Sequence, residues 1–235
     1  MTMNLDKLIE MQRELDNKIR EEKGLQDADL VANTYVALQV ELAEFANEAR
    51  WFKYWSENQE PNTECVCELC EGRKNISALT DTGSAGETYE VYDVYEVEVV
   101  CPLCEGYDND KNPLIEEYID SLHFFLSLAI QKGWEKQLYV YEEAILDLQE
   151  EGFDGGLSGV YLEMIYYLNK SYMENNRNEE IEKTFNKTVQ EFNFNTAWFL
   201  FIAIGLIGFG FTKEQIEQAY IDKNKINHER QENGY

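Results

Sequence analysis

The chain has 235 residues, 44% of them hydrophobic, which is enough for one sizeable domain or for a domain with a small insertion. Its 46 acidic residues against 20 lysines and arginines give a formal net charge of -26. A body this acidic repels nucleic acid and anionic membrane surfaces, so neither is expected as a partner. The N-terminus has no apolar signal core, and the most apolar run, Trp198 to Phe211, is shorter than the ~18 residues that a membrane span needs. We therefore expect a cytoplasmic protein.

The spacing of apolar residues predicts an all-α fold with a small inserted module. Helices are expected at residues 4–22, 27–55, 114–133, 140–149, 158–174, 178–192, 196–208 and 212–230. Residues 58–112 differ in character, because they contain cysteines, turn residues and an alternating strand-like run at 89–100. The sequence thus predicts one helical domain, formed by residues 1–57 and 113–235, and an insertion at 58–112.

A pair of glutamates marks the second helix. Its apolar residues, Val40 and Ala43 among them, recur at three- and four-residue steps, so we expect this helix to bury one face. Glu41 and Glu44 lie three residues apart in the same rhythm, and residues at this spacing sit one above the other on a helix. Two such carboxylates suit a divalent cation, although a solvated acidic stripe has the same pattern.

A second acidic pair, Glu117 and Asp120, opens a helix whose continuation is apolar on nearly every side. A buried helix does not carry ionised carboxylates unless they are paired or bound to metal, because desolvation of a charge is costly. Two antiparallel helices with two acids each would form an all-oxygen cage, which favours Mg²⁺ or Mn²⁺ over zinc. The sequence therefore predicts a metal site suited to phosphates.

The inserted region carries two CxxC turns with nearly the same local sequence, CELCEG at 67–72 and CPLCEG at 101–106. Two such turns complete a tetrahedral site for a structural Zn²⁺, with the ligands Cys67, Cys70, Cys101 and Cys104. Together with the strand-like run, this pattern predicts a zinc-ribbon-like module. The alternative is a set of reduced or disulfide-linked cysteines without metal, and Cys65 could substitute for Cys67.

The C-terminal helix presents two cations and an amide on one face. Thr212 is a plausible N-cap, and Lys223, Asn227 and Arg230 follow at spacings of four and three residues. In a chain with so few bases, this face is a candidate phosphate clamp, because Arg forks onto oxygens and Lys acts as a point charge. The alternative is a solvated helix end whose cations offset the helix dipole.

Three of these segments resemble a known family in the same order. The segments are ELAEFANEARWFKYW at 41–55, EEYIDSLHFFLSLAI at 116–130 and YIDKNKINHERQENGY at 220–235. They are similar to the dimeric dUTP diphosphatases of the all-α NTP pyrophosphohydrolase superfamily, and the likeness covers residues 3–56 and 113–235. The four acids alone mark only the superfamily, whereas FKYW, DxxHF and KNxxNHxRQxxGY are more specific. The cysteine module separates the two acidic motifs further than is usual in the family.

The resemblance implies hydrolysis of dUTP, and of dUDP, to dUMP by a homodimer that uses Mg²⁺. It implies that the four acids bind the metal, with Glu44 as the general base. Three sets of residues match the family's functional positions: the metal-binding acids Glu41, Glu44, Glu117 and Asp120; the phosphate- and sugar-contacting Lys223, Asn227, Arg230 and Tyr235; and, around the base pocket, Gln12, Trp55, His123 and Phe124. For His123 and Trp55 a place in the core is the alternative, and Lys53 could reach phosphate or cap its helix.

Two other functions stay open at this level. The four acids fit a pyrophosphohydrolase for another nucleotide, such as dCTP, equally well. A different class of function is binding: the inserted ribbon could dock on a protein partner. Its acidic strand would then suit a basic protein surface, through Glu90, Asp93, Glu96 and Glu98.

Overall fold

The structure, a computed structural model, describes residues 4–64, 75–81, 94–100 and 112–234. The chain divides into two compact units. The first combines Met1–Pro61 with Leu114–Tyr235, and the second is Asn62–Pro113. Each unit is described by itself.

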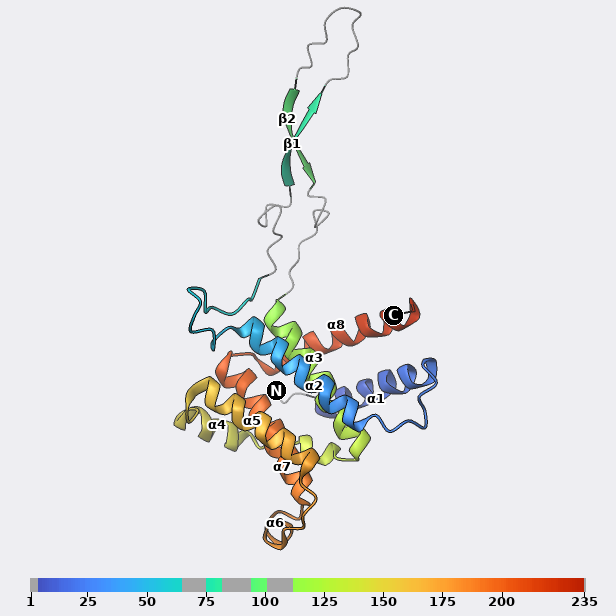
Figure 1. Cartoon of the computed structure of the whole chain (residues 1–235), viewed down its shortest axis with the longest axis vertical. Helices are drawn as coiled ribbons and strands as arrows, with labels where there is room; N and C mark the ends of the chain where they lie inside the picture. Colours follow the sequence, from blue (N-terminus) through green and yellow to red (C-terminus); the bar gives the residue numbers. More distant parts are fainter. Residues whose placement is uncertain (1–3, 65–74, 82–93, 101–111, 235) are drawn as a thin grey trace, which may run out of the picture. The chain divides into compact units, whose positions relative to one another are not determined.

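The first unit is helical throughout its regular structure, which confirms the predicted all-α fold class (Figure 1). Two single turns depart from α-helical geometry: the 3₁₀ turn η1 and the π-helical turn η2. In chain order the elements are α1 (Leu5–Glu22), α2 (Val31–Ala49), α3 (Pro113–Lys132), η1 (Glu135–Leu138), α4 (Glu142–Glu151), α5 (Gly156–Met173), α6 (Glu179–Phe185), α7 (Val189–Ala203), η2 (Ile204–Gly208) and α8 (Lys213–Glu232).

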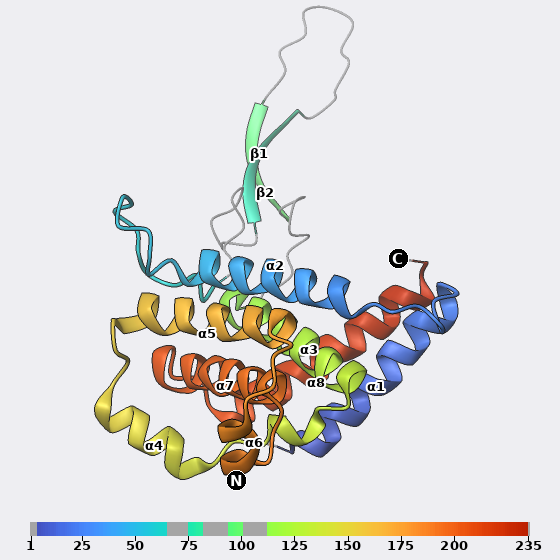
Figure 2. The same cartoon turned by 60° about the horizontal axis from the view of Figure 1, so that its bottom comes forward.

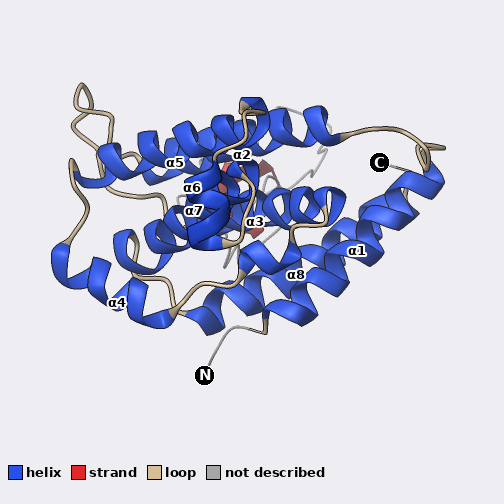
Figure 3. Cartoon of the chain, turned by 90° about the horizontal axis from the view of Figure 1, so that it is seen from below, coloured by secondary structure: helices blue, strands red, loops and turns tan. Residues whose placement is uncertain are grey.

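Helix α3 forms the centre of the core, as its nearly continuous apolar sequence predicts. It lies between the α1 and α8 pair on one side and the α5 and α7 pair on the other (Figures 2 and 3). The ring of Tyr118 stacks on Phe201 of α7 with ring centroids 4.3 Å apart. Gly205 permits this approach, because a Cβ atom there would lie 2.5 Å from the Tyr118 hydroxyl oxygen.

Hydrogen bonds join helices around α3: α1 to α8, and α2 to α5. Tyr220 of α8 donates its buried hydroxyl to the carbonyl oxygen of Leu8 in α1 at 3.3 Å. On the other side, the hydroxyls of Tyr35 in α2 and Ser171 in α5 lie 2.8 Å apart. These contacts bring residues from both ends of the chain to the faces of α3.

Helix α2 is shorter than the range 27–55 that its periodicity predicts. The carboxylate of Asp29 accepts the backbone N–H of Val31, which marks the first turn. At the other end, Arg50 adopts a left-handed conformation with φ 62°, and its N–H donates to the carbonyl oxygen of Ala46. Only Gly and Asn adopt this conformation often, so an arginine gives no sequence signal for the end of the helix.

The prediction of separate helices at 178–192 and 196–208 is also wrong. The structure places the break at Asn186, which has φ 52°. Thr188 then caps α7 in a capping box with Glu191, and the helix continues without interruption to Ala203. The segment Val189–Gly208 is long and apolar enough to cross a membrane by length and composition, with mean hydropathy 1.3, but 56% of it is buried inside the fold.

The second unit contains an antiparallel strand pair, β1 (Asn75–Asp81) and β2 (Val94–Val100), labelled in Figure 1. The register runs from Asn75 opposite Val100 to Asp81 opposite Val94. Strand β2 lies within the alternating run 89–100, of which residues 89–93 fall outside the described part. The five cysteines also fall outside it, so the zinc site stays a prediction.

Candidate active site

Three of the four predicted acids come together where α2 and α3 pack. Glu41 projects from α2, and Glu117 and Asp120 project from successive turns of α3; one carboxylate oxygen of each lies within 4.8 Å of the other two. We call these three residues the carboxylate cluster. All three side chains are partly buried. The i, i+3 spacing on α3 and the packing of α2 against it produce the cluster, as the sequence predicts.

Burial and mutual repulsion disfavour the ionised forms of the cluster. Burial is the main cause that raises the pKa of Glu41 to about 7, and the charges of Asp120 and Glu44 add to it. Burial likewise raises the pKa of Glu117 to about 7, and the charge of Asp120 adds most among the neighbouring acids. The pKa of Asp120 is also raised by burial, although hydrogen bonding to Lys223 opposes the shift. Such a cluster is stabilised by protons or by a cation.

Glu44, the fourth predicted acid, lies apart from the other three. Its side chain is exposed on α2, one turn beyond Glu41. Its charge still contributes to the raised pKa values of Glu41 and Glu117, so it lies within electrostatic reach of the cluster.

Lys223 of α8 reaches into the cluster, and its contacts are not those of a solvated helix end. Its Nζ lies 2.7 Å from Oδ2 of Asp120 and 2.8 Å from Oε1 of Glu116, and the residue is only 8% exposed. Burial alone would lower the pKa of Lys223, but hydrogen bonds to Asp120 and Glu116 raise it. The sequence analysis missed Glu116, although its position four residues before Asp120 places it on the same face of α3.

A buried polar network joins α1, α3 and α8 next to the cluster. Gln12 of α1 is its centre: its Oε1 accepts the Tyr220 hydroxyl at 2.8 Å and lies 2.6 Å from Nδ1 of His123. The rings of His123 and Tyr220 stack with centroids 4.2 Å apart. The Nε2 atom of Gln12 donates to Asp16 at 2.7 Å. The structure therefore brings two predicted base-pocket residues, Gln12 and His123, into contact, and it adds Asp16 and Tyr220.

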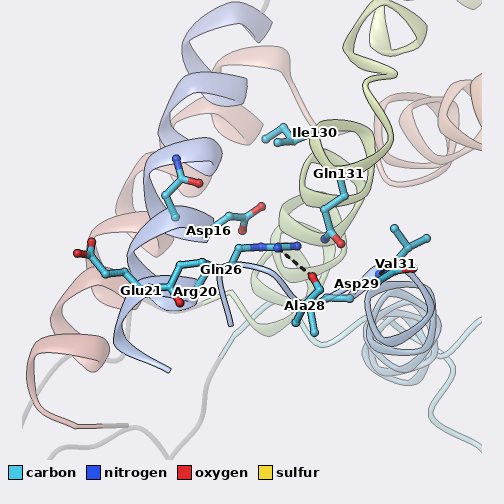
Figure 4. Close-up of a pocket in the computed structure, with 11 residues that line it drawn as sticks. Asp16, Arg20, Glu21, Gln26, Ala28, Asp29, Val31, Ile130 and Gln131 are labelled. Carbon is cyan, nitrogen blue, oxygen red and sulfur yellow. Dashed lines mark hydrogen bonds between the residues drawn. The ribbon is translucent and has the colours of Figure 1, made fainter. Parts of the chain in front are cut away.

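Asp16 connects this network to a cavity of about 600 Å³ between α1 and α3, drawn in Figure 4. Arg20 and Gln131 also line the cavity, and Figure 4 shows both side chains turned toward the space beside Asp16. Arg20 donates to the carbonyl oxygen of Ala28 at 3.2 Å. Burial raises the pKa of the Asp16 carboxyl, although hydrogen bonding to Ser127 and Gln12 opposes the shift.

The remaining predicted residues lie in three different environments. Phe124 is partly buried against the core, whereas Trp55 is 65% exposed and makes edge-on ring contacts with Phe52 and Tyr54. On α8, Asn227 is partly buried and Arg230 is exposed. The charge of Arg230 lowers the pKa of Asp120, so this arginine acts on the cluster electrostatically. Tyr235 lies outside the described residues.

The comparison with protein families identifies the chain. A family model described as dUTPase matches residues 4–72 and 105–235, which include all four predicted acids and the predicted phosphate and base residues. No curated protein matches the chain. The stretch between the two matched segments, residues 73–104, lies within the second compact unit. A divalent cation is the usual cofactor of this family, and the carboxylate cluster offers oxygen ligands for one. The chain belongs to the all-α dUTPase family, and its reaction is the hydrolysis of dUTP.

Proposed function

We propose that this chain hydrolyses dUTP, and also dUDP, to dUMP in the carboxylate cluster with Mg²⁺ as the cofactor. The observation that carries the proposal is the convergence of Glu41, Glu117 and Asp120 within 4.8 Å, with the pKa of each carboxyl raised above its ordinary value. Carboxylate oxygens are the ligands that Mg²⁺ and Mn²⁺ prefer, and the cluster contains no sulfur or imidazole donor. When bound there, the divalent cation supplies charge neutralisation for the phosphates and a lowered pKa for a water molecule.

The chain's own residues have distinct roles in this proposal. Glu41, Glu44, Glu117 and Asp120 hold the metal, and Glu44 takes the proton of the attacking water as general base, because it is the exposed member of the four. Lys223 and Arg230 offset the charge of the phosphate chain in a protein whose net charge is -26. The proposed phosphate and sugar contacts are completed by Asn227 and Tyr235.

The base pocket is proposed to form around Gln12 and His123, with Phe124 and Trp55 supplying ring surface. Every polar atom of the Gln12 amide already has a partner: Oε1 accepts Tyr220, and Nε2 donates to Asp16. His123 is held against Tyr220 by stacking. This network supports a pocket whose polar groups are fixed before the substrate binds, which is how a site discriminates between bases of similar size.

The proposed homodimer is supported by exposed apolar side chains along two adjacent helices. Leu162 and Met173 of α5 are 67% and 70% exposed, and Val36 and Val40 of α2 are 62% and 49% exposed. The periodicity of α2 predicts a buried Val40, and this prediction is wrong for the single chain. A hydrogen bond between Tyr35 and Ser171 joins α2 to α5, and we propose that a second copy of the chain covers the exposed apolar side chains of both helices. Sedimentation of wild type and Leu162→Glu tests this: a monomeric wild type would contradict it.

The function is tested by pyrophosphate release from each deoxynucleoside triphosphate, with Mg²⁺ present and then chelated. Among the triphosphates, we expect metal-dependent turnover of dUTP alone. In a separate assay, dUDP should release phosphate. Turnover of dCTP instead would retain the carboxylate cluster and overturn the proposed uracil pocket. No turnover of any nucleotide, with Mg²⁺ bound, would contradict the catalytic role and shift attention to a binding role for the second unit.

A further inference from the structure

The ammonium group of Lys223 is shared between two carboxylates, and only one of them belongs to the carboxylate cluster. Asp120 is a cluster member, whereas Glu116 lies one helical turn before it on α3. The two distances, 2.7 Å to Asp120 and 2.8 Å to Glu116, are both those of charge-assisted hydrogen bonds. Lys223 thus contributes a positive charge at the site where the proposed metal would bind.

An ammonium group and a divalent cation that both contact the Asp120 carboxylate would repel each other strongly. When Asp120 turns to a metal, Lys223 therefore loses one of its two partners. Its side chain is only 9% exposed, so the ammonium group cannot simply move into bulk water. A charge buried to this degree needs a partner. Glu116 is in place to be that partner, because it already contacts Nζ and its own side chain is 29% exposed.

We propose that Glu116 is a positioning residue: its carboxylate holds the Lys223 ammonium group beside the cluster after Asp120 has turned to the metal. The inference rests on the proposed metal site and goes beyond it, because Glu116 binds neither metal nor phosphate in this role. Glu116 would let the metal displace the Lys223 ammonium group from Asp120 and would still hold that ammonium group where the phosphates approach.

This role predicts what happens when the Glu116 charge is removed. Of the two carboxylates that contact Lys223, only Asp120 keeps its charge in Glu116→Gln. The ammonium group therefore competes with the metal for Asp120. We expect the affinity for Mn²⁺, used as the probe, to fall about 10-fold, the scale found for groups that orient metal ligands. The KM for dUTP should rise, because the ammonium group is no longer held for the phosphates, whereas kcat at saturating metal should change less.

The test is a double-mutant cycle on Mn²⁺ binding to the full chain without substrate. The cycle compares wild type, Glu116→Gln, Lys223→Met and the double variant, with Glu229→Gln as a control for the loss of one acidic charge near the C-terminus. If Glu116 acts through Lys223, Glu116→Gln weakens binding in the wild-type background and has little effect beside Lys223→Met. If Glu116 were itself a metal ligand, the Glu116→Gln substitution would weaken Mn²⁺ binding equally in the wild-type and Lys223→Met backgrounds. This result would overturn the inference.

Two further results separate this inference from the proposed function. Failure of the wild-type chain to bind Mn²⁺ would overturn the metal site and the inference together. Normal Mn²⁺ binding with equal losses in both backgrounds would overturn only the role of Glu116. Should Glu116→Gln fold poorly, Glu116→Asp serves in its place, because it keeps the charge but shortens the side chain. Its Mn²⁺ affinity is expected to fall by less than the ~10-fold loss expected for Glu116→Gln. If Glu116→Asp had the same Mn²⁺ affinity and the same KM for dUTP as wild type, this result would contradict a positioning role.

Discussion

The Nδ1 atom of His123 lies 2.6 Å from Oε1 of Gln12, and both side chains are buried. The amide of Gln12 has a fixed orientation, because its Nε2 must face the carboxylate of Asp16. An amide oxygen only accepts, so His123 carries its proton on Nδ1 and is neutral. Burial, the main cause, lowers the pKa of His123 to about 3, and the charge of Lys223 lowers it further. His123 is therefore a neutral ring at neutral pH.

The first prediction concerns the stability of this network. Gln12→Leu preserves the approximate volume but removes the acceptor beside His123 Nδ1 and leaves the Tyr220 hydroxyl only its longer contact to Leu8, so the free energy of unfolding should fall by about 1 to 3 kcal/mol. Urea denaturation measures the loss. The matched control is Gln218→Leu, an exposed glutamine on α8, which should change stability by less than ~0.5 kcal/mol. Equal effects of the two substitutions would show that the network adds nothing.

The second prediction is a pH dependence of metal binding. Metal binds the ionised carboxylates, and burial raises the pKa of Glu41 and Glu117 to about 7. Affinity for Mg²⁺ should therefore rise between about pH 6 and about pH 8, with release of protons on binding. Calorimetry in buffers of different ionisation enthalpy counts these protons. Glu41→Gln should release fewer of them, and a binding constant independent of pH would contradict the raised pKa values.

The same shift affects the stability of the metal-free protein. Because the folded-state pKa of each glutamate lies above its unfolded value, the folded state binds more protons between about pH 4.5 and about pH 7. The metal-free chain should therefore lose stability as the pH rises through this window, and Mg²⁺ should restore it. A thermal midpoint that rises over this window in the absence of metal would contradict this sign.

How much of the site follows from sequence depends on how far apart its residues lie in the chain. Glu117 and Asp120 are one helical turn apart, so periodicity alone places them together, and an apolar helix carrying them predicts a partner for their charge. Asp16, by contrast, looks like any acid of an exposed helix face. Its burial depends on the packing of α1 against α3, which a one-dimensional pattern does not contain.

The pairing of Lys223 with Glu116 shows the same limit. The two residues are 107 positions apart, and the spacing within α8 predicts only that Lys223 shares a face with Asn227. Which acids that face meets is decided by where α8 crosses α3. Two helix boundaries, at Arg50 and Asn186, differ from the predicted ones, and both residues adopt left-handed conformations. An arginine gives no sequence signal for this conformation, whereas an asparagine is compatible with it but does not require it.

The third prediction is that Asp120→Asn abolishes turnover without unfolding the chain. The amide keeps the shape of the carboxylate but removes its charge, so kcat/KM should fall by at least ~100-fold. The free energy of unfolding should be unchanged or higher, because one negative charge leaves a crowded cluster. Asp147→Asn on the exposed face of α4 is the matched control. Activity near that of wild type in Asp120→Asn would contradict the metal site.

The fourth prediction addresses the phosphate contacts on α8. Arg230→Ala should raise the KM for dUTP by about 10-fold, because a charge-assisted contact to phosphate is lost, and it should leave stability nearly unchanged because the residue is exposed. Lys225→Ala removes an equal charge from the same helix, where the Lys225 side chain is 78% exposed and faces Glu229. A similar KM for dUTP in Arg230→Ala and Lys225→Ala would contradict a specific phosphate contact by Arg230 and would indicate only a general electrostatic effect.

The last prediction separates the two compact units. If Cys67, Cys70, Cys101 and Cys104 bind zinc, the purified chain should contain about one zinc ion, and Cys101→Ser should lose it. Cys65→Ser is the matched control and should keep the metal, unless Cys65 takes the place of Cys67. Because all four predicted acids belong to the first unit, zinc removal followed by excess Mg²⁺ should leave dUTP turnover largely intact. Loss of turnover under these conditions would mean that the insertion supports the fold of the catalytic unit, whereas retained turnover leaves the second unit available for a protein partner.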